Sequence, residues 1–522
     1  MSVRATIKRQ IWQVKQLGWR GFAELKGPQL ENRLLRHPFL VIFLWVGLFP
    51  LFLIRNLVRS NGVRTLPELH KRLRQALDPA PRIEFSDPEI EKFLEGARRI
   101  GNSENRETGF RELLEGKDRY PESFEISNAL SNELYFRGQR AEMVSEYRNG
   151  CAIQDKEAEA RGLTELGIRI LDQSWSGPMG HIALLDQLAK ARELGWLTDE
   201  RRLVIANRRS TSNLSYLRYW EEHFPILFME NLGSEELRRV LWPLYERPEM
   251  FRFHDGPVDY WSAFTKVDEE WNRQSRAPLL KLSESDRAQS EPIFREWGMP
   301  EGSWFVCFHI REGAHRRRGS ENADPLTYVS AMKEVVRRGG FAIRMGNPAM
   351  TPLPKLKGVI DYAHAEQRAD WLDVALWAQC KFFVGTNSGP LCVPASFGVP
   401  TLSTNVPHIG LVPSMRNSMF IPKNCAVANG SEFVPFSTLL GMPVAWTSAK
   451  QPAEDKIRLI DNSPDELCLA IIDMFAALQA SEHSFGPNTQ QLIFDQIRCN
   501  AGGIGSMPIS PSFLTTNYEL LR

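Results

Sequence analysis

The sequence predicts an α/β protein with two doubly wound lobes, preceded by an N-terminal membrane-associated helix and a short all-α helical-hairpin region. Apolar strands alternate with helical segments in two separate series, one from near residue 167 and one from Trp304. The stretch from about 88 to 155 shows helical spacing only, and one uncharged apolar stretch lies near the N-terminus.

Length and composition indicate a folded protein of several domains. The 522 residues exceed what one compact core requires, so about three domains are expected. Hydrophobic residues make up 43% and charged residues 24%, which is typical of globular proteins. A net charge of +1 gives no reason to expect nucleic acid as a partner. The seven cysteines include no C-x-x-C pair, and we interpret them as reduced, which indicates the cytosol.

Residues 38–54 carry no charge and would form a helix about 26 Å long, close to the lower limit for crossing a hydrocarbon core of about 30 Å. Basic residues precede the segment, and Arg55 and Arg59 follow it, so both flanks are expected in the cytoplasm. An in-plane or hairpin anchor satisfies both flanks, and we favour it over a single span; a buried core helix is the third interpretation. The expected location is the cytoplasmic face of the inner membrane, with lipid contacts through 1–64.

The helical stretch resembles a tetratricopeptide-type helix pair. Leu130, Leu134, Gly138, Met143 and Tyr147 recur at helix-hairpin spacing. One or two such units are fewer than the three or so repeats that a free solenoid needs, so this region is expected to pack on its neighbours. We interpret it as a spacer; a protein partner on its surface and a homo-oligomer are alternatives left open.

The first α/β series consists of a strand at 167–171, a tight loop at 176–181, a helix at 182–194 and a strand at 202–206. Helices are expected near 213–223 and 234–246, and the polar run at 267–290 is expected to bridge the lobes. The second series has strands at 304–310, 341–345, 381–385 and from 400, with helices at 325–338 and 370–379. Ser463 and Glu466 form a capping box that starts the last helix.

A glycine-rich loop, Gly385 to Pro390, follows an apolar strand and opens a short helix. Backbone N–H groups and the positive end of a helix suit a phosphate, although a tight turn alone is the alternative. Arg311 and Arg344 end two other strands of the same predicted sheet. Because open α/β sheets bind ligands at the carboxyl ends of their strands and arginine contacts phosphate bidentately, this edge is the candidate site.

These residues carry a family resemblance. The run 387–400 is similar to the donor-site loop of bacterial heptosyltransferases, and His309-x-Arg311 resembles the donor-phosphate motif of the protein O-fucosyltransferase and α1,6-fucosyltransferase group. Both belong to the class with two Rossmann-like lobes, GT-B. The combination is most similar to a family of bacterial glycosyltransferases linked to envelope polysaccharides and often fused to helical repeats, over about 165–520.

The resemblance implies a glycosyltransferase that takes a sugar from a nucleotide-sugar donor. It implies donor contacts from His309, Arg311, Arg344, Gly346, Asp361, Gly385, Thr386, Asn387, Ser388 and Gly389. Asn387 and Cys392 replace the heptosyltransferase Asp and His, which disfavours an ADP-linked donor and leaves GDP- and UDP-sugars. The expected acceptor is an envelope polysaccharide or other glycan, a glycolipid or a protein.

The expected domains are four. They are the basic, apolar membrane-anchoring segment 1–64, the helical region 65–160, a first Rossmann-like lobe on the acceptor side at 161–298, and a second on the donor side at 299–522, with a C-terminal helix and tail.

A leaving nucleoside diphosphate is stabilised by a metal or by arginines and helix ends. The sequence has no Asp-x-Asp, so we expect no metal and no cofactor. Candidates for a general base are His181, Asp186 and His254. For His181, a structural role with its side chain bonded to its own loop is an equal alternative.

The main rival function is a membrane-tethered helical-repeat adaptor with a non-catalytic nucleotide-binding domain. A sugar epimerase is disfavoured because no G-x-G-x-x-G follows an early strand.

Overall fold

The computed structural model describes residues 88–99, 106–228, 241–313, 320–412, 414–427, 430, 432–442, 457–479, 489–501, 503 and 505–522. The chain divides into two compact units, Met1–Ile83 and Glu84–Arg522, and every described residue belongs to the second. The predicted anchor at 1–64 lies outside the described residues. None of the helices in the described ranges is long and apolar enough to cross a membrane.

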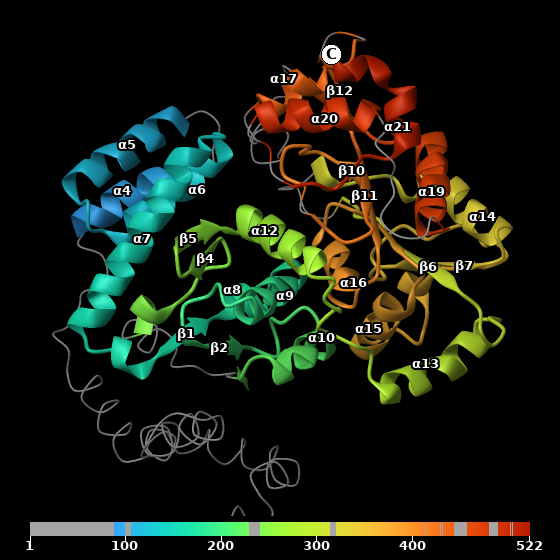
Figure 1. The fold of residues 1–522 in the computed structure, drawn as a ribbon, viewed down its shortest axis with the longest axis horizontal. Coiled ribbons are helices and arrows are strands. Elements are labelled where there is room, and N and C mark those ends of the chain that lie inside the picture. The colour runs from blue at the N-terminus through green and yellow to red at the C-terminus, as the bar shows by residue number, and fades with distance from the viewer. Residues whose placement is uncertain are drawn as a thin grey trace, which may run out of the picture. The chain divides into compact units, whose positions relative to one another are not determined.

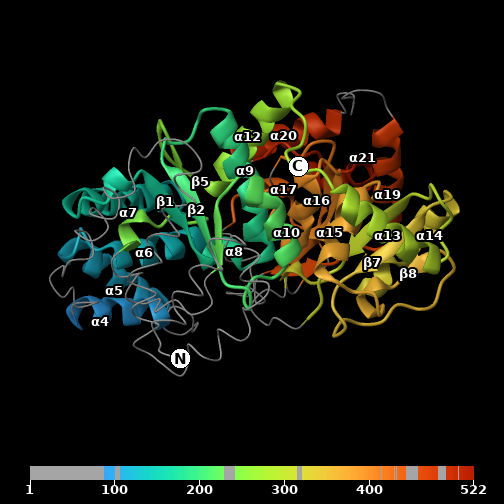
Figure 2. The same cartoon turned by 90° about the horizontal axis from the view of Figure 1, so that it is seen from below.

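The predicted helical region is confirmed as helical. It contains α4 (Pro88–Arg99), α5 (Arg106–Arg119), α6 (Phe124–Phe136) and α7 (Arg140–Ala160). Ser123 caps α6, since its hydroxyl accepts a hydrogen bond from the Ile126 N–H. As expected, the region packs on its neighbour. The Gln154 side chain of α7 donates hydrogen bonds to the main-chain oxygens of Trp242 and Tyr245. The helix α7 also lies against β5 (Figures 1 and 2). The likeness to tetratricopeptide repeats stays a prediction.

The first α/β series forms a three-stranded parallel sheet in the order β1-β2-β3. Its strands are β1 (Ile168–Leu171), β2 (Arg201–Ala206) and β3 (Ile226–Phe228). The predicted loop at 176–181 was wrong in extent: a short helix, α8 (Gln173–Ser176), fills its start, and α9 (Met179–Glu193) begins three residues earlier than expected. Pro178 is the reason, because it stands at the N-cap of α9 with extended backbone, where its missing N–H costs nothing.

Between the two sheets the chain is more helical than predicted. It contains α10 (Leu214–Tyr219), the antiparallel hairpin of β4 (Met250–Phe253) and β5 (Gly256–Asp259), α12 (Tyr260–Arg273) and α13 (Glu284–Glu296). Asp259 and Ser283 cap α12 and α13 with their side-chain oxygens, so only 274–283 of the predicted polar bridge is irregular. Most of the helix predicted at 234–246 lies outside the described residues.

The second series forms a six-stranded, all-parallel sheet in the order β11-β10-β9-β6-β7-β8. The strands are β6 (Phe305–His309), β7 (Phe341–Met345), β8 (Val359–Ile360), β9 (Phe383–Thr386), β10 (Thr401–Val406) and β11 (Met419–Pro422). The chain runs outward from β6 through β7 and β8, and then returns to the other side of β6 with β9. The strand order therefore reverses between β6 and β9.

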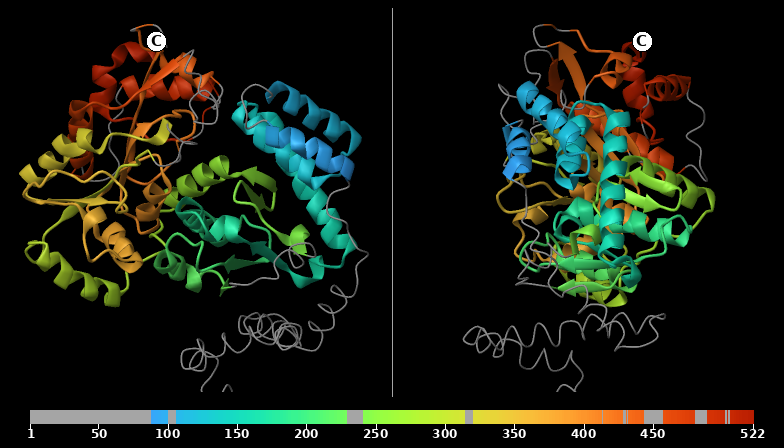
Figure 3. Two further views of the ribbon diagram at one scale, coloured as in Figure 1. Left: turned by 180° about the vertical axis from the view of Figure 1, so that it is seen from behind. Right: turned by 90° about the vertical axis from the view of Figure 1, so that its left-hand side faces the viewer.

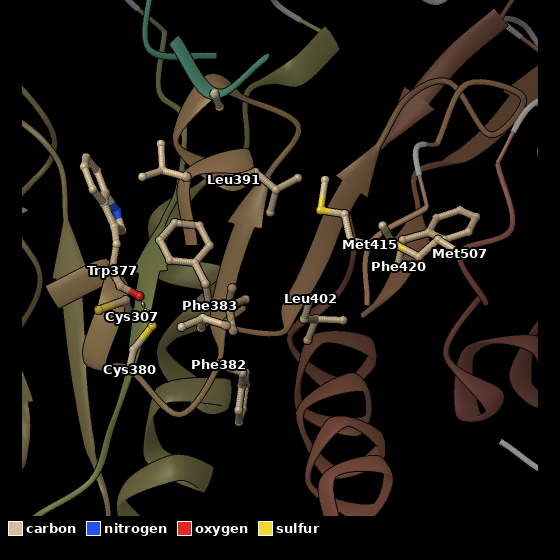
Figure 4. Close-up of a cluster of buried hydrophobic side chains, with 14 of the residues drawn as sticks. Cys307, Trp377, Cys380, Phe382, Phe383, Leu391, Leu402, Met415, Phe420 and Met507 are labelled. Atoms are coloured by element: carbon tan, nitrogen blue, oxygen red, sulfur yellow. Dashed lines mark hydrogen bonds between the residues drawn. The ribbon is translucent and has the colours of Figure 1, made fainter. Parts of the chain in front are cut away.

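Helices cover both faces of this sheet (Figure 1). The helix α15 (Asp370–Gln379) lies on one face beside α13, while α14 (Val329–Arg337) and α19 (Pro464–Gln479) pack together on the other. On the first face the Cys307 thiol of β6 lies 3.6 Å from the Leu376 carbonyl oxygen. On the second face Phe382 packs edge-on against Phe475 of α19. Figure 4 shows the buried side chains that fill the layer around β9, among them Phe383, Leu391 and Leu402.

The predicted start of α19 is confirmed. The Glu466 N–H donates to the Ser463 hydroxyl at 3.2 Å, and the Ser463 N–H donates to the Glu466 carboxylate at 2.8 Å, which is a capping box. The short helix predicted after the glycine-rich loop is confirmed as α16 (Cys392–Ser396). Other elements around α19 were not predicted: β12 (Asn424–Val427) and β13 (Ile457–Ile460), which pair antiparallel, and the helices α17 (Phe436–Leu440), α20 (Thr489–Asn500) and α21 (Pro511–Thr516). Figure 3 shows these C-terminal helices, in orange and red, gathered at one end of the second lobe.

Candidate functional site

The candidate site lies at the carboxyl ends of β6 and β9, where the strand order reverses. His309 at the end of β6 pairs in register with Gly385 of β9, which places Arg311 beside the loop that follows Thr386. A reversal of strand order leaves the two following loops diverging to opposite faces, and open α/β sheets bind ligands in the crevice so formed. The predicted placement of Arg311 and the 385–390 loop on one sheet edge is confirmed.

Arg311 is held at this edge by both its main chain and its side chain. Its N–H donates to the Thr386 hydroxyl at 3.0 Å, so this fully buried threonine fixes the backbone of the arginine. Its guanidinium donates to the Glu321 carboxylate at 2.6 Å, and the two side chains are 16% and 17% exposed. The arginine therefore already has an anionic partner from within the chain.

His309 is uncharged at neutral pH. Burial, together with the positive charges of Arg344 and Arg311, lowers the pKa of its imidazole to about 4. Its Nδ1 lies 3.3 Å from the Ser388 hydroxyl, which joins β6 to the glycine-rich loop. The residue therefore offers a hydrogen bond and no charge to a ligand at this edge.

Arg344 has a different position from the one expected of a phosphate ligand. Its side chain is fully buried, and its terminal nitrogens donate to the Asp361 carboxylate at 3.0 Å, to the Glu312 carboxylate at 2.6 Å and to the Thr351 carbonyl. The same two carboxylates accept from the main-chain N–H groups of Leu353 and Thr351. Arg344 and Asp361 thus fix the shape of the loop after β7. The positive charge of Arg344 faces two negative charges from within the chain, those of Glu312 and Asp361.

Gly346 begins this loop and requires glycine. Its φ is +152°, and an added Cβ would lie 2.3 Å from the Met350 sulfur. The predicted donor contacts Arg344, Gly346 and Asp361 therefore act on the shape of the site, whereas a direct contact with the donor from any of them stays untested.

The glycine-rich loop touches the first lobe directly. A Cβ added to Gly389 would lie 2.6 Å from the Gly180 nitrogen, and one added to Gly180 would lie 3.0 Å from the Gly389 Cα. Such an approach of two backbones is available only to residues without a side chain. Asn387, Ser388 and Gly389 are half-buried at this junction. Both lobes therefore meet at the loop, and α9 starts beside it.

His181 stands in the first turn of α9, next to Gly180. Its Nδ1 lies 2.6 Å from the Ser174 carbonyl oxygen, so the histidine is bonded to its own loop, which was the alternative left open by the sequence. A carbonyl oxygen only accepts, so Nδ1 carries the hydrogen in this bond. The neutral ring consequently keeps its lone pair on Nε2, the form in which a histidine accepts a proton.

The other two candidate bases have other surroundings. Asp186 is buried and bonded to Lys190 at 2.6 Å, and Lys190 also bonds Asp268 at 2.8 Å. Burial raises the pKa of Asp186 to about 6, against the lowering effect of Lys190. His254 lies in the β4–β5 hairpin, half-exposed and 4.0 Å from the Asp199 carboxylate. Of the three, the structure brings His181 beside the glycine-rich loop, whereas Asp186 belongs to an ion-paired cluster between α9 and α12.

Two acidic residues of the site were missed by the sequence analysis. Glu312 follows Arg311 directly and could have been suspected as a strand-end carboxylate. Glu321 lies ten residues after Arg311, and no local spacing marks it as the partner of that arginine. Across the described part of the chain, no three or more His, Cys, Asp and Glu side chains gather as a metal site would require.

Comparisons with known proteins give partial structural matches. No family profile and no curated protein matches the sequence. Among solved structures, the chain is similar to a glycosyl transferase family 9 protein from Veillonella parvula, with 17% identity over 46% of this chain and 67% of the other at a TM-score of 0.26. It is also similar to the ADP-heptose LPS heptosyltransferase II of E. coli, with 14% identity over 60% of this chain and 100% of the other at 0.37.

A third match is the iron-containing dodecameric glycosyltransferase TibC of enterotoxigenic E. coli, with 10% identity over 68% of this chain and 75% of the other at a TM-score of 0.31. Glycosyltransferases are thus among the structures that this chain resembles. Because each superposition is loose, the function has to be argued from the geometry of the site.

Proposed function

We propose that the chain transfers a sugar from a nucleotide-sugar donor, with the donor diphosphate bound at the carboxyl ends of β6 and β9. The observation that carries the proposal is the junction at the strand-order reversal. There Arg311 and the His309–Ser388 pair stand on the second lobe, and Gly389, the residue after Ser388, lies directly against Gly180 of the first lobe, the neighbour of His181. Donor and acceptor groups from two lobes are thereby brought to one place, as a transfer between two substrates requires.

In the proposed reaction, an acceptor hydroxyl oxygen forms a bond to the anomeric carbon of the sugar. The bond from that carbon to the phosphate oxygen breaks, and its electron pair leaves with the nucleoside diphosphate. Arg311 compensates the charge that develops on the leaving diphosphate, and a hydrogen bond from the neutral His309–Ser388 pair adds to it. His181 takes the acceptor proton on Nε2, the nitrogen that the bond from Nδ1 to Ser174 leaves unprotonated.

The remaining parts of the proposal come from the sequence. A GDP- or UDP-linked donor is favoured over an ADP-linked one, because Asn387 and Cys392 depart from the heptosyltransferase pattern. Transfer is proposed to be independent of metal and cofactor, to use a glycan, glycolipid or protein acceptor, and to take place at the cytoplasmic face of the inner membrane through 1–64.

A thermal-shift and calorimetric screen of nucleoside diphosphates and their sugars tests the donor site, because a ligand that binds only the folded state raises its apparent stability. We expect one nucleotide to bind and its affinity to fall in Arg311→Ala. His181→Gln should keep donor affinity and lose turnover. If no nucleoside diphosphate binds the folded chain, the proposal is wrong; nucleotide binding without transfer would favour the membrane-tethered adaptor instead.

A further inference from the structure

A cavity of about 150 Å³ lies on the same edge of the six-stranded sheet, beyond β9. Its wall comes from parts of the chain that are distant in sequence. Arg140 and Met143 belong to the start of α7, Trp261 belongs to α12, His408 belongs to the loop after β10, and Leu440 belongs to α17. The helical region, α12 of the first lobe and the second lobe therefore enclose this cavity together.

The cavity lies near the candidate donor site because of sheet geometry. His408 follows β10, which is the neighbour of β9, and Lys423 follows β11, the next strand along. Adjacent strands are about 4.8 Å apart, so the cavity begins roughly 5–15 Å from the end of β9 along the carboxyl edge. A ligand that fills the cavity is therefore within reach of the proposed donor sugar.

The wall is apolar and basic. Tyr135 and Leu439 add to its apolar surface, and its charged residues are Arg140 and Lys423, with no aspartate or glutamate among the described lining residues. Arg140 is bonded to Asp259 at 3.1 Å, and Lys423 to Asp461 at 2.6 Å, so each cation is held in place by a carboxylate that is not among the lining residues. A ligand in the cavity consequently meets apolar side chains and cations.

Two buried N–H groups of the wall also lack an acceptor. The Nε of Arg140 and the Nε1 of Trp261 are covered from solvent, and neither has a hydrogen-bond partner in the described part of the chain. An unpaired buried donor destabilises the folded chain, and an acceptor oxygen of a ligand would satisfy it after a small adjustment of the wall.

We propose that this cavity binds the acceptor, through an acidic group, carboxylate or phosphate, and an adjoining apolar part. The inference rests on the proposed function and narrows its acceptor class to amphipathic anions. The nucleoside of the donor is the other molecule within reach. It is disfavoured because a nucleoside is uncharged, and because its N–H groups would find no carboxylate in this wall.

Photolabelling of the full-length chain tests the cavity. The probe is 4-benzoylbenzoate, which is anionic and aromatic and whose excited ketone inserts readily beside methionine sulfur; uncharged benzophenone is the control probe. We expect labelling by 4-benzoylbenzoate, mapped by mass spectrometry, at Met143 or Met442, both of which line the cavity. Equal labelling by the two probes, or no label at either methionine, would overturn the proposal.

Leu440→Glu places a carboxylate in the wall, and Leu440→Gln is its matched uncharged control. Like charges repel strongly at a partly buried site, so Leu440→Glu should lower labelling by about tenfold or more, and Leu440→Gln by less than about threefold. Leu440 is half-buried, so both variants should fold. Equal loss in the two variants would show that the cavity has no preference for anions and would overturn the inference.

Binding of inorganic pyrophosphate and of GDP or UDP to the same variants separates the two proposals. We expect all three affinities to stay unchanged in Leu440→Glu. Weaker nucleotide binding with unchanged pyrophosphate binding would place the nucleoside in the cavity and overturn the acceptor assignment. If pyrophosphate does not bind the wild-type chain, the donor site fails, while the labelling result still reports on the cavity.

Discussion

The pair of Arg311 and Glu321 predicts opposite effects of two substitutions on diphosphate binding. In the structure a Glu321 carboxylate oxygen lies 2.6 Å from a terminal nitrogen of the Arg311 guanidinium. A diphosphate that binds Arg311 therefore competes with Glu321 for the positive charge of the guanidinium. Arg311→Ala should weaken binding because it removes the cation, and Glu321→Gln should strengthen binding because it removes the competing anion.

The magnitudes follow from the exposure of the pair. A charge-assisted hydrogen bond to a diphosphate contributes about 1.5–3 kcal/mol, and the ion pair that it replaces contributes about 1 kcal/mol or less because both side chains retain some solvent. The difference, about 1–2 kcal/mol, corresponds to an affinity loss of roughly five- to thirtyfold in Arg311→Ala. Glu321→Gln should raise affinity by up to about fivefold.

Isothermal calorimetry with inorganic pyrophosphate and with the best nucleoside diphosphate measures both effects. Glu291→Gln is the control, because it removes one negative charge from an exposed position on α13. Arg311→Lys should recover little, since a point charge cannot reproduce the planar fork. Affinity within about twofold of wild type in a folded Arg311→Ala, or no gain in Glu321→Gln, would refute the reasoning.

Four further outcomes are expected. Gly389→Ala should separate the two backbones at Gly180, lowering diphosphate affinity and costing about 1–3 kcal/mol of stability, whereas Gly313→Ala, which meets nothing within 4 Å, should do neither. Burial lowers the pKa of His408 to about 4, so the unfolded chain binds its proton first as pH falls. Stability should fall from about pH 6.5 to 4, and thermal melts should show a smaller fall in His408→Gln. Transfer should survive EDTA; loss of transfer restored by magnesium or manganese would contradict a metal-free mechanism. Removal of 1–64 should release the protein from membranes with nucleotide binding intact; unchanged pelleting with membranes would contradict the anchor.

Local signals in the sequence predicted the elements that position the site. The strand ending at His309, the strand before Thr386 and the helix begun by Ser463 were all found, because continuous apolar runs of strand length and capping boxes are written in neighbouring residues. Placement of Arg311 and the glycine-rich loop on one sheet edge followed from the rule that parallel strands share their carboxyl edge.

The features that were missed depend on contacts between distant residues. The pairing of β12 with β13 joins short strands thirty or so residues apart, and neither has a strong alternation of its own. The approach of Gly180 to Gly389 joins two lobes, and each glycine alone is typical of a turn. The early start of α9 was a local error, because Pro178 was read as part of a loop when it is the N-cap.

The two strand-end arginines show why residue type and position alone do not assign a ligand. Arg344 is fully buried between Glu312 and Asp361, so the loss of both carboxylates would leave an uncompensated buried charge, a large cost of about 3–5 kcal/mol. Arg311 has Glu321 as its carboxylate partner and retains solvent contact, so exchange of that partner for a phosphate costs far less. Both arginines end parallel strands of one sheet. The burial of Arg344 between two carboxylates and the partial exposure of Arg311, which the sequence does not reveal, favour Arg344 as a positioning residue and Arg311 as the proposed donor contact.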